Sequence, residues 1–174
     1  MEFLKSLFGG GGGGASSAGS AIPDWVEALP RGVEALAIAR LLLEMAHADG
    51  DFDDAERKQL SDDLAHEFQL DADQASKLFD LAEAKFSDQV EFSSLILQLK
   101  AKCSVEERAE ILRLLWKVAY ADGKLNDFEF ALVRRMAAML YVEGPALGVA
   151  RRKALEELGF DPETPAGADP VALS

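Results

Sequence analysis

One short motif occurs twice in this chain, and it limits the folds that the chain can form. The segment from Arg40 to Glu56 aligns with the segment from Arg113 to Glu129 at a shift of 73 residues, with nine of seventeen positions identical. Both copies read Ala-x-Ala-Asp-Gly-x-hydrophobic-Asp/Asn-x-x-Glu. The glycine is typical of a helix end, and the Asp or Asn with the later Glu is typical of a helix start. The chain therefore contains two copies of one helix-corner-helix unit.

Helix signals cover the middle of the chain. The stretch that ends at Ala48 is apolar almost all round, which predicts a helix at the centre of a bundle. Capping boxes predict helix starts after Asp53, Ser104 and Asn126, and Gly159 follows the last amphipathic segment. No stretch of the sequence alternates for long enough to indicate a strand. We therefore predict an all-α bundle of about seven helices with two pseudo-symmetric helix-corner-helix repeats.

The two ends of the chain differ in composition from the middle. A short apolar segment is followed by six glycines, Gly9 to Gly14, and a run of Ser, Ala and Gly, so residues 1–22 are predicted to be a short helix plus a flexible linker. Residues 23–158 are predicted to form the helical domain. The proline-containing residues 159–174 are predicted to be a disordered tail.

The apolar segment at the start leaves two interpretations open. Phe3, Leu4, Leu7 and Phe8 lie on one face of a helix. They indicate a small helix that docks on a membrane surface or a partner, or else a terminal stub that packs loosely. The segment is too short for the apolar region of a secretion signal.

Charge and cysteine content restrict the partners. Thirty-one acidic residues stand against eighteen basic ones, and the net charge of −13 disfavours nucleic acid and anionic lipid and favours cations or a basic protein. The single cysteine, Cys103, has no partner for an internal disulfide, which predicts a cytoplasmic protein. No apolar run reaches the roughly 20 residues that span a bilayer. Membrane contact is therefore expected only through residues 3–8.

The sequence offers no set of residues for catalysis or for binding a cofactor. His47 and His66 both lack the second ligand or base that helical sites place one turn away. His47 is expected to be a hydrogen-bonded histidine at a helix end, the alternative being a contribution to a cation site. The basic run Arg151-Arg152-Lys153 is expected to be a solvated helix face, the alternative being contact with the acidic corners. We predict that the protein is not an enzyme.

Most of the repeated motif has a structural explanation, but one carboxylate in each copy does not. Asp49 and Asp122 are expected in the last turn of a helix, where the helix dipole makes a negative charge unfavourable by roughly 0.3 to 1 kcal/mol. An arginine, a metal ion or a hydrogen bond from a following amide could each offset that cost.

Calcium binding of the EF-hand type is excluded by the spacing. Each corner matches the second half of an EF-hand loop, but the acidic positions of the first half fall on Met45, His47, Val118 and Tyr120. A cation site would have to be weaker, or built from both corners together. Its hypothetical ligands are Asp49, Asp53, Glu56, Asp122 and Glu129.

The doubled Ala-Asp-Gly motif, with two intervening helices, resembles the TerB-like family. This family includes the tellurite-resistance TerB proteins and the N-terminal domain of the DjlA co-chaperone. The resemblance covers about residues 24–158. It implies an all-helical bundle of two similar halves, acidic motif residues proposed to bind metal, and a link to stress responses at the inner membrane. The chain lacks the His-Pro-Asp motif of a J-domain, so the resemblance does not extend to that part of the co-chaperone.

Two hypotheses for the function follow. The first is a binding module that uses the duplicated acidic corners for weak recognition of a divalent cation or a basic protein partner in a stress pathway. The second is a scaffolding or co-chaperone-like protein tethered by its N-terminal helix, with an inner-membrane stress complex as the expected partner and with purely structural corners.

Overall fold

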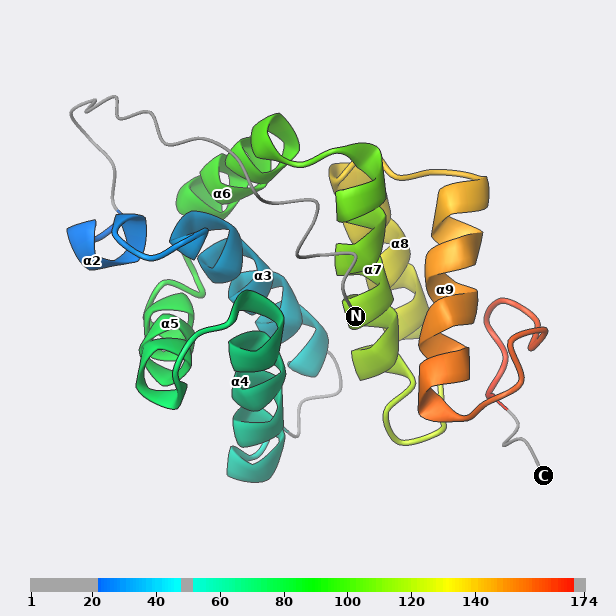
Figure 1. The fold of residues 1–174 in the computed structure, drawn as a ribbon. Coiled ribbons are helices and arrows are strands. Elements are labelled where there is room, and N and C mark those ends of the chain that lie inside the picture. Colours follow the sequence, from blue (N-terminus) through cyan, green and yellow to red (C-terminus); the bar gives the residue numbers. More distant parts are fainter. Residues whose placement is uncertain (1–21, 48–51, 171–174) are drawn as a thin grey trace.

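A computed structural model describes residues 22–47 and 52–170. Within these residues the chain is helical and has no strand, which confirms the predicted all-α fold (Figure 1). The eight helices, labelled as in Figure 1, are α2 (Asp24–Glu27), α3 (Gly32–Ala46), α4 (Asp54–Phe68), α5 (Ala72–Ala84), α6 (Gln89–Lys102), α7 (Val105–Ala119), α8 (Asp127–Met139) and α9 (Pro145–Leu158). None of these helices is long and apolar enough to span a bilayer.

The predicted capping residues start the helices. In each box the first side chain accepts a hydrogen bond from the backbone three residues on, and the side chain there accepts one in return. The reciprocal pairs are Asp53 with Glu56 in α4, Asp71 with Gln74 in α5, Ser104 with Glu107 in α7 and Asn126 with Glu129 in α8. These local signals set the helix starts.

Helix α3 is the centre of the bundle, as its all-round apolar sequence predicts. It packs against helices of both halves, among them α4 to α6 on one side and α7 on the other. Its one basic side chain, Arg40, is buried beside Phe86 and Phe92 and pairs with Glu44 at 2.7 Å. The arginine also donates a hydrogen bond to the carbonyl oxygen of Phe86. A buried charge is thereby partnered.

Each repeat forms a pair of helices that are consecutive in the chain. Helices α3 and α4 carry the first copy, helices α7 and α8 carry the second, and α5 and α6 connect them. In Figure 1, α4 and α7 lie on either side of α3, and α9 covers the outer side of α7. The first corner (residues 46–56) and the second corner (residues 119–129) close the two helix pairs. Residues 48–51 of the first corner lie outside the described part of the chain.

The ends of the helical domain differ from the predicted boundaries. Ile22, assigned to the linker, is buried in the core. Residues 159–170, expected to be part of a disordered tail, form a C-terminal segment that lies on the second half. Thr164 is buried, and the backbone amide of Leu125 donates to Asp169 at 2.7 Å. The proline-rich composition of this segment does not reveal these contacts, because they are made with residues far away in the chain.

Candidate functional site

The first corner uses its described carboxylates as helix caps. One oxygen of Asp53 accepts hydrogen bonds from the amides of Ala55 at 2.8 Å and Glu56 at 2.9 Å. The Glu56 carboxylate accepts from the Asp53 amide at 3.2 Å. Asp49, the residue that capping did not explain, lies outside the described residues. Capping therefore engages both predicted ligands that the structure describes here.

The second corner gives Asp122 a structural role as well. Helix α7 ends at Ala119, so Asp122 lies beyond the last helical turn rather than within it. One of its oxygens accepts a hydrogen bond from the Lys124 amide at 2.8 Å, an Asx turn, while Gly123 adopts a left-handed φ of 75°. The expected penalty from the helix dipole is thus weakened by position and offset by this bond. Of the three alternatives that the sequence left open, the structure has the Asx bond at Asp122.

Glu129, the last predicted ligand, completes the cap of α8. Its carboxylate accepts a hydrogen bond from the Asn126 amide at 3.0 Å. Across residues 22–47 and 52–170, no three His, Cys, Asp or Glu side chains are grouped so that they could hold a metal ion. The four described ligands do not by themselves form such a group. A cation site at the corners remains a prediction that depends on Asp49.

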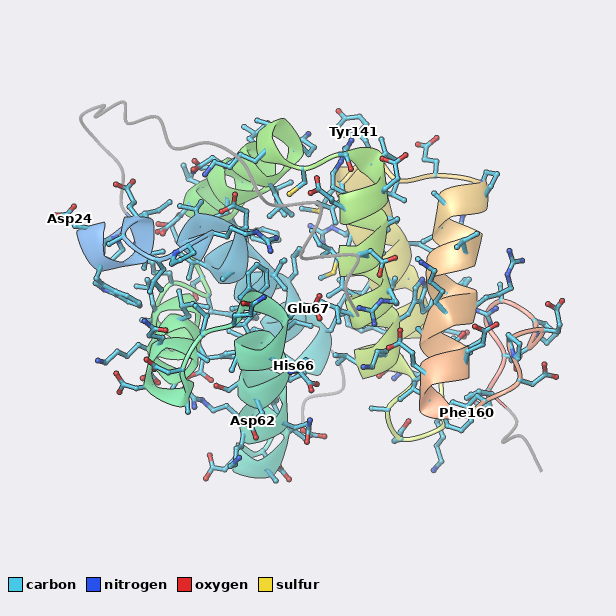
Figure 2. All side chains as sticks on the ribbon, in the orientation of Figure 1. Asp24, Asp62, His66, Glu67, Tyr141 and Phe160 are labelled. Atoms are coloured by element: carbon cyan, nitrogen blue, oxygen red, sulfur yellow. The ribbon has the colours of Figure 1, made fainter. Side chains whose placement is uncertain are left out.

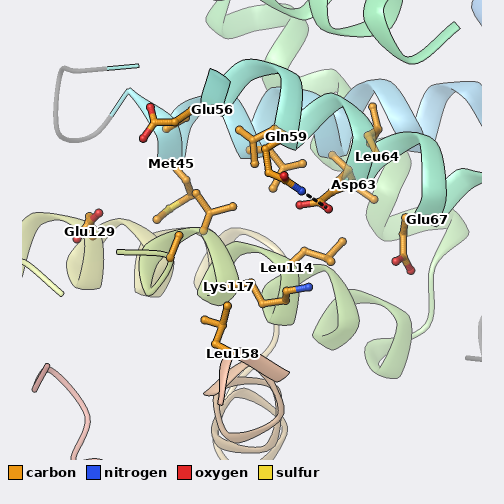
Figure 3. A pocket seen from close by; sticks show the side chains of 16 residues that line it. Met45, Glu56, Gln59, Asp63, Leu64, Glu67, Leu114, Lys117, Glu129 and Leu158 are labelled. Atoms are coloured by element: carbon orange, nitrogen blue, oxygen red, sulfur yellow. Dashed lines mark hydrogen bonds between the residues drawn. The ribbon is translucent and has the colours of Figure 1, made fainter. Parts of the chain in front are cut away.

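The two corners instead meet at the end of a groove between α4 and α7. The groove has a volume of about 380 Å³. Its apolar walls come from α3, α4 and α7, with Ala121 beyond α7 and Leu158 from α9, and Figure 3 shows them facing the open space. The apolar lining residues are Ile38, Leu42, Met45, Ala46, Leu60, Leu64, Leu114, Val118, Ala121 and Leu158.

Pseudo-symmetry places this groove where the two repeats face each other. Met45 and Val118 occupy equivalent positions of the two copies, and so do Glu56 and Glu129. All four line the groove. The groove is therefore a joint product of the duplication rather than a property of either corner alone.

The polar rim of the groove is mainly acidic. It carries Glu56, Asp63 and Glu67 along α4 and Glu129 at the start of α8. Figures 2 and 3 show Glu67 near the end of α4, on the side that faces α7. Among the described residues, the three α4 carboxylates form no salt bridge. The rim therefore carries negative charge that could interact with a cationic ligand.

Among the described residues of the rim there is one cation, Lys117, and it is paired. Lys117 lines the groove from α7, and its ammonium lies 3.3 Å from a carboxylate oxygen of Glu157. The next carboxylate along α4, Asp62, is not part of the rim and pairs with Lys58 at 2.5 Å. Asp62 is therefore a carboxylate next to Asp63 in the chain that does not border the groove.

Sequence reasoning missed this groove. The apolar residues Leu114 and Val118 of α7 are only half-buried. Their repeat equivalents Leu41 and Met45 are buried. The sequence of α4 does contain an indication of the groove. Apolar and acidic residues share one face of this helix at helical spacing, namely Glu56, Leu60, Asp63, Leu64 and Glu67. What the sequence cannot give is the separation between α4 and α7.

Cys103 and His47 both have structural surroundings away from the groove. Burial raises the pKa of the Cys103 thiol to about 11, so it is protonated near neutral pH. His47 is the expected helix-end histidine. Its Nδ1 lies 2.9 Å from the carbonyl oxygen of Leu43, and its ring packs against Phe52 and Phe86. Neither residue lines the groove.

The basic run on α9 differs from its expected solvated state. Arg151 is buried and donates from Nε to the Tyr120 hydroxyl at 2.8 Å and from Nη2 to the carbonyl oxygen of Pro165 at 2.9 Å. Lys153 pairs with Glu110 at 2.8 Å, and only Arg152 is left exposed without such a contact among the described residues. Arg151 and Lys153 therefore connect α9 to other parts of the second half.

A protein-family model described as tellurite resistance protein TerB matches residues 35–152. The chain belongs to the TerB family. The match spans most of α3 through the first half of α9 and includes both corners and nearly all of the groove. The family assignment made from the doubled motif is confirmed. No curated protein and no solved structure matches the chain.

Proposed function

We propose that this TerB family protein is a non-enzymatic binding module whose groove between α4 and α7 takes an amphipathic helix with basic flanks. The observation that carries the proposal is an apolar groove with an acidic rim at the junction of the two repeats. We place the protein in the cytoplasm, in a tellurite-resistance-like stress context, on its composition and family.

The shape of the groove supports a helical ligand. Its walls are themselves two helices, α4 and α7, with α3 behind them. A helix that lies between two helices and buries one apolar face is a recurring mode of peptide recognition.

The charge of the rim supports a basic ligand over an acidic one. Glu56, Asp63, Glu67 and Glu129 border the apolar walls, and the chain as a whole carries −13. Lysine or arginine side chains at the edges of a bound helix would face these carboxylates. Such complementarity mainly increases the association rate and excludes acidic competitors.

A designed peptide tests the proposal directly. The probe is a 14-residue helix of Leu and Lys only, with leucines at i, i+3, i+4 and i+7 spacing, and a second peptide has Glu at every Lys. We expect the full chain to bind the Leu/Lys peptide and to bind the Leu/Glu peptide at least about tenfold more weakly in low salt. Equal binding of both peptides would contradict a role for the rim.

Two matched pairs of variants locate the site. Asp63→Lys reverses a rim charge and should weaken the Leu/Lys peptide about threefold to tenfold, whereas Asp62→Lys, on the neighbouring residue outside the rim, should not. Leu114→Gln places an amide in the groove wall and should weaken binding about tenfold. The same change at Leu97, an exposed leucine of α6, should have no effect.

Divalent cation binding at the corners is the second candidate function. The favouring observation is that Glu56 and Glu129, one from each corner, line the same groove. Melting temperature measured against calcium, magnesium and zinc tests it, because a ligand that binds only the native state raises stability. A rise that disappears in Asp49→Asn with Asp122→Asn would support a cation site. A melting temperature that does not respond in the wild type would reject it.

A further inference from the structure

The groove has a candidate occupant within the same chain. Residues 1–21 lie outside the described residues and begin with the apolar segment Met1 to Phe8. At about 100° per residue, Phe3, Leu4, Leu7 and Phe8 share one face of a helix, Lys5 borders that face, and Glu2 is opposite. As a helix, residues 1–8 would have an apolar face with a basic flank, the class of ligand that the groove is proposed to take.

We propose that residues 1–8 occupy the groove of their own chain and compete there with a partner helix. This inference rests on the proposed function of the groove and adds its regulation. The apolar face of residues 1–8 packs on the walls formed by Leu60, Leu64, Leu114 and Val118. Lys5 then lies at the acidic rim, while Glu2 points away from it.

The linker is long enough to allow this placement. Thirteen residues, 9–21, separate Phe8 from the buried Ile22. Fully extended they span at most about 45 Å, and as a glycine-rich coil their root-mean-square span is about 20 Å. A domain of this size has a radius of gyration of about 15 Å, hence a diameter of about 40 Å. The groove borders the second half of α3, from Ile38 to Ala46, and α3 is only about 22 Å long and directly follows α2 in the chain, so the groove is within reach of residues 1–8.

Because residues 1–8 are tethered to the domain, even a weak intrinsic affinity would keep the groove mostly occupied. A short flexible linker gives an effective concentration of about 1 mM. If the free segment bound the groove with a Kd of about 0.1 mM, the ratio of closed to open molecules would be about ten. A partner helix would then bind about tenfold more weakly than to an open groove, because its apparent affinity falls with the open fraction.

The test compares peptide binding to two full-length proteins. The probe is the Leu/Lys peptide, and the variant is Leu4→Asp with Leu7→Asp, which removes the apolar face. We expect the variant to bind the probe about tenfold more tightly than the wild type. Ser16→Asp with Ser17→Asp adds the same two charges to the linker and should bind as the wild type does. Equal affinity of the wild type and the Leu4/Leu7 variant would overturn self-occupancy while leaving the groove as a binding site.

A second measurement separates this inference from the proposed function. Photo-crosslinking from p-benzoylphenylalanine at position 4 of the full chain reports where the segment lies. We expect crosslinks within one chain to peptides of α4 or α7, and Leu114→Gln should reduce their yield whereas Leu97→Gln should not. Crosslinks between two chains, or scattered over other helices, would overturn the inference. Crosslinks at the groove in a protein that does not bind the Leu/Lys peptide would contradict the proposed function but support the intramolecular contact.

Discussion

The two corners share a sequence motif but differ in what surrounds them. In the second corner, Tyr120 is fully buried and accepts a hydrogen bond from Arg151. In the first corner the equivalent residue, His47, is exposed, and its Nδ1 lies 2.9 Å from the carbonyl oxygen of Leu43 in the same helix. Among the described residues, Tyr120 is therefore bonded to another helix, whereas His47 is bonded within its own.

The C-terminal segment (residues 159–170) contributes to the difference. Asp169 accepts from the Leu125 amide, and the ring of Phe160 lies beside Gly123, near the end of α9 in Figure 2. In the described part of the first corner, the corresponding contacts are the aromatic ones of His47 with Phe52 and Phe86. We expect the second corner to be the more stable of the two.

The largest effect should come from deleting the ring at the equivalent position of each corner. Tyr120→Ala removes a fully buried aromatic side chain and leaves Arg151 without its hydroxyl partner, so it should lower the free energy of unfolding by about 4 kcal/mol. His47→Ala should cost about 1 kcal/mol or less, because the residue is exposed. Urea unfolding of both variants measures the contrast. Equal losses of unfolding free energy in the two variants would contradict the expectation that the second corner is the more stable one.

Removing the arginine should have the next largest effect. Arg151→Met keeps much of the side-chain volume but leaves the Tyr120 hydroxyl and the Pro165 carbonyl without their donor, at a cost of about 2 kcal/mol. Arg152→Met, on the exposed neighbour, is the control and should change the unfolding free energy by less than about 0.5 kcal/mol. A similar result for both would mean that α9 does not fasten the second corner through Arg151.

Alkaline pH should destabilise the second corner through Tyr120. Burial raises the pKa of this phenol above its usual value of 10.0, although the Arg151 bond opposes the shift. The raised pKa means that stability is fully present below about pH 10 and is lost as pH rises further, since the unfolded state ionises first. Tyr120→Phe should therefore lose less stability than the wild type above pH 10. Cys103, with a pKa of about 11, affects both proteins alike, so the difference between their unfolding curves isolates Tyr120.

The smallest expected effect is local. Asp169→Ala removes the acceptor of the Leu125 amide, and that amide should exchange its hydrogen about fivefold to tenfold faster. Glu163→Ala changes another exposed acid of the C-terminal segment and should leave the exchange rate as it is. If the exchange rate of the Leu125 amide were unchanged in Asp169→Ala, the C-terminal segment would not contribute to the stability of the second corner.

Much of the fold follows from local signals in the sequence. Capping boxes such as Asp53 with Glu56 depend on residues three apart, and the apolar α3 needs only its own composition to be placed at the centre. The family also follows from the motif itself. These features could be predicted because each is encoded within one or two helical turns.

The features that escaped prediction depend on contacts between distant segments. Arg151 looks like part of a solvated basic run until Tyr120, 31 residues away, is placed beside it. Asp122 was expected in the last turn of a helix, but α7 ends at Ala119, so Asp122 lies beyond the helix. The groove required the spacing of α4 and α7, which neither helix encodes alone.

The position of α3 has a consequence for the way the two halves fold. This helix belongs to the first copy of a duplicated unit, yet it packs against α4, α5 and α6 as well as α7 and α8. A copy cut away at the boundary between the repeats would expose the apolar surface of α3 or lose it altogether. The two halves therefore share one core, and we expect them to fold and unfold as a single cooperative unit.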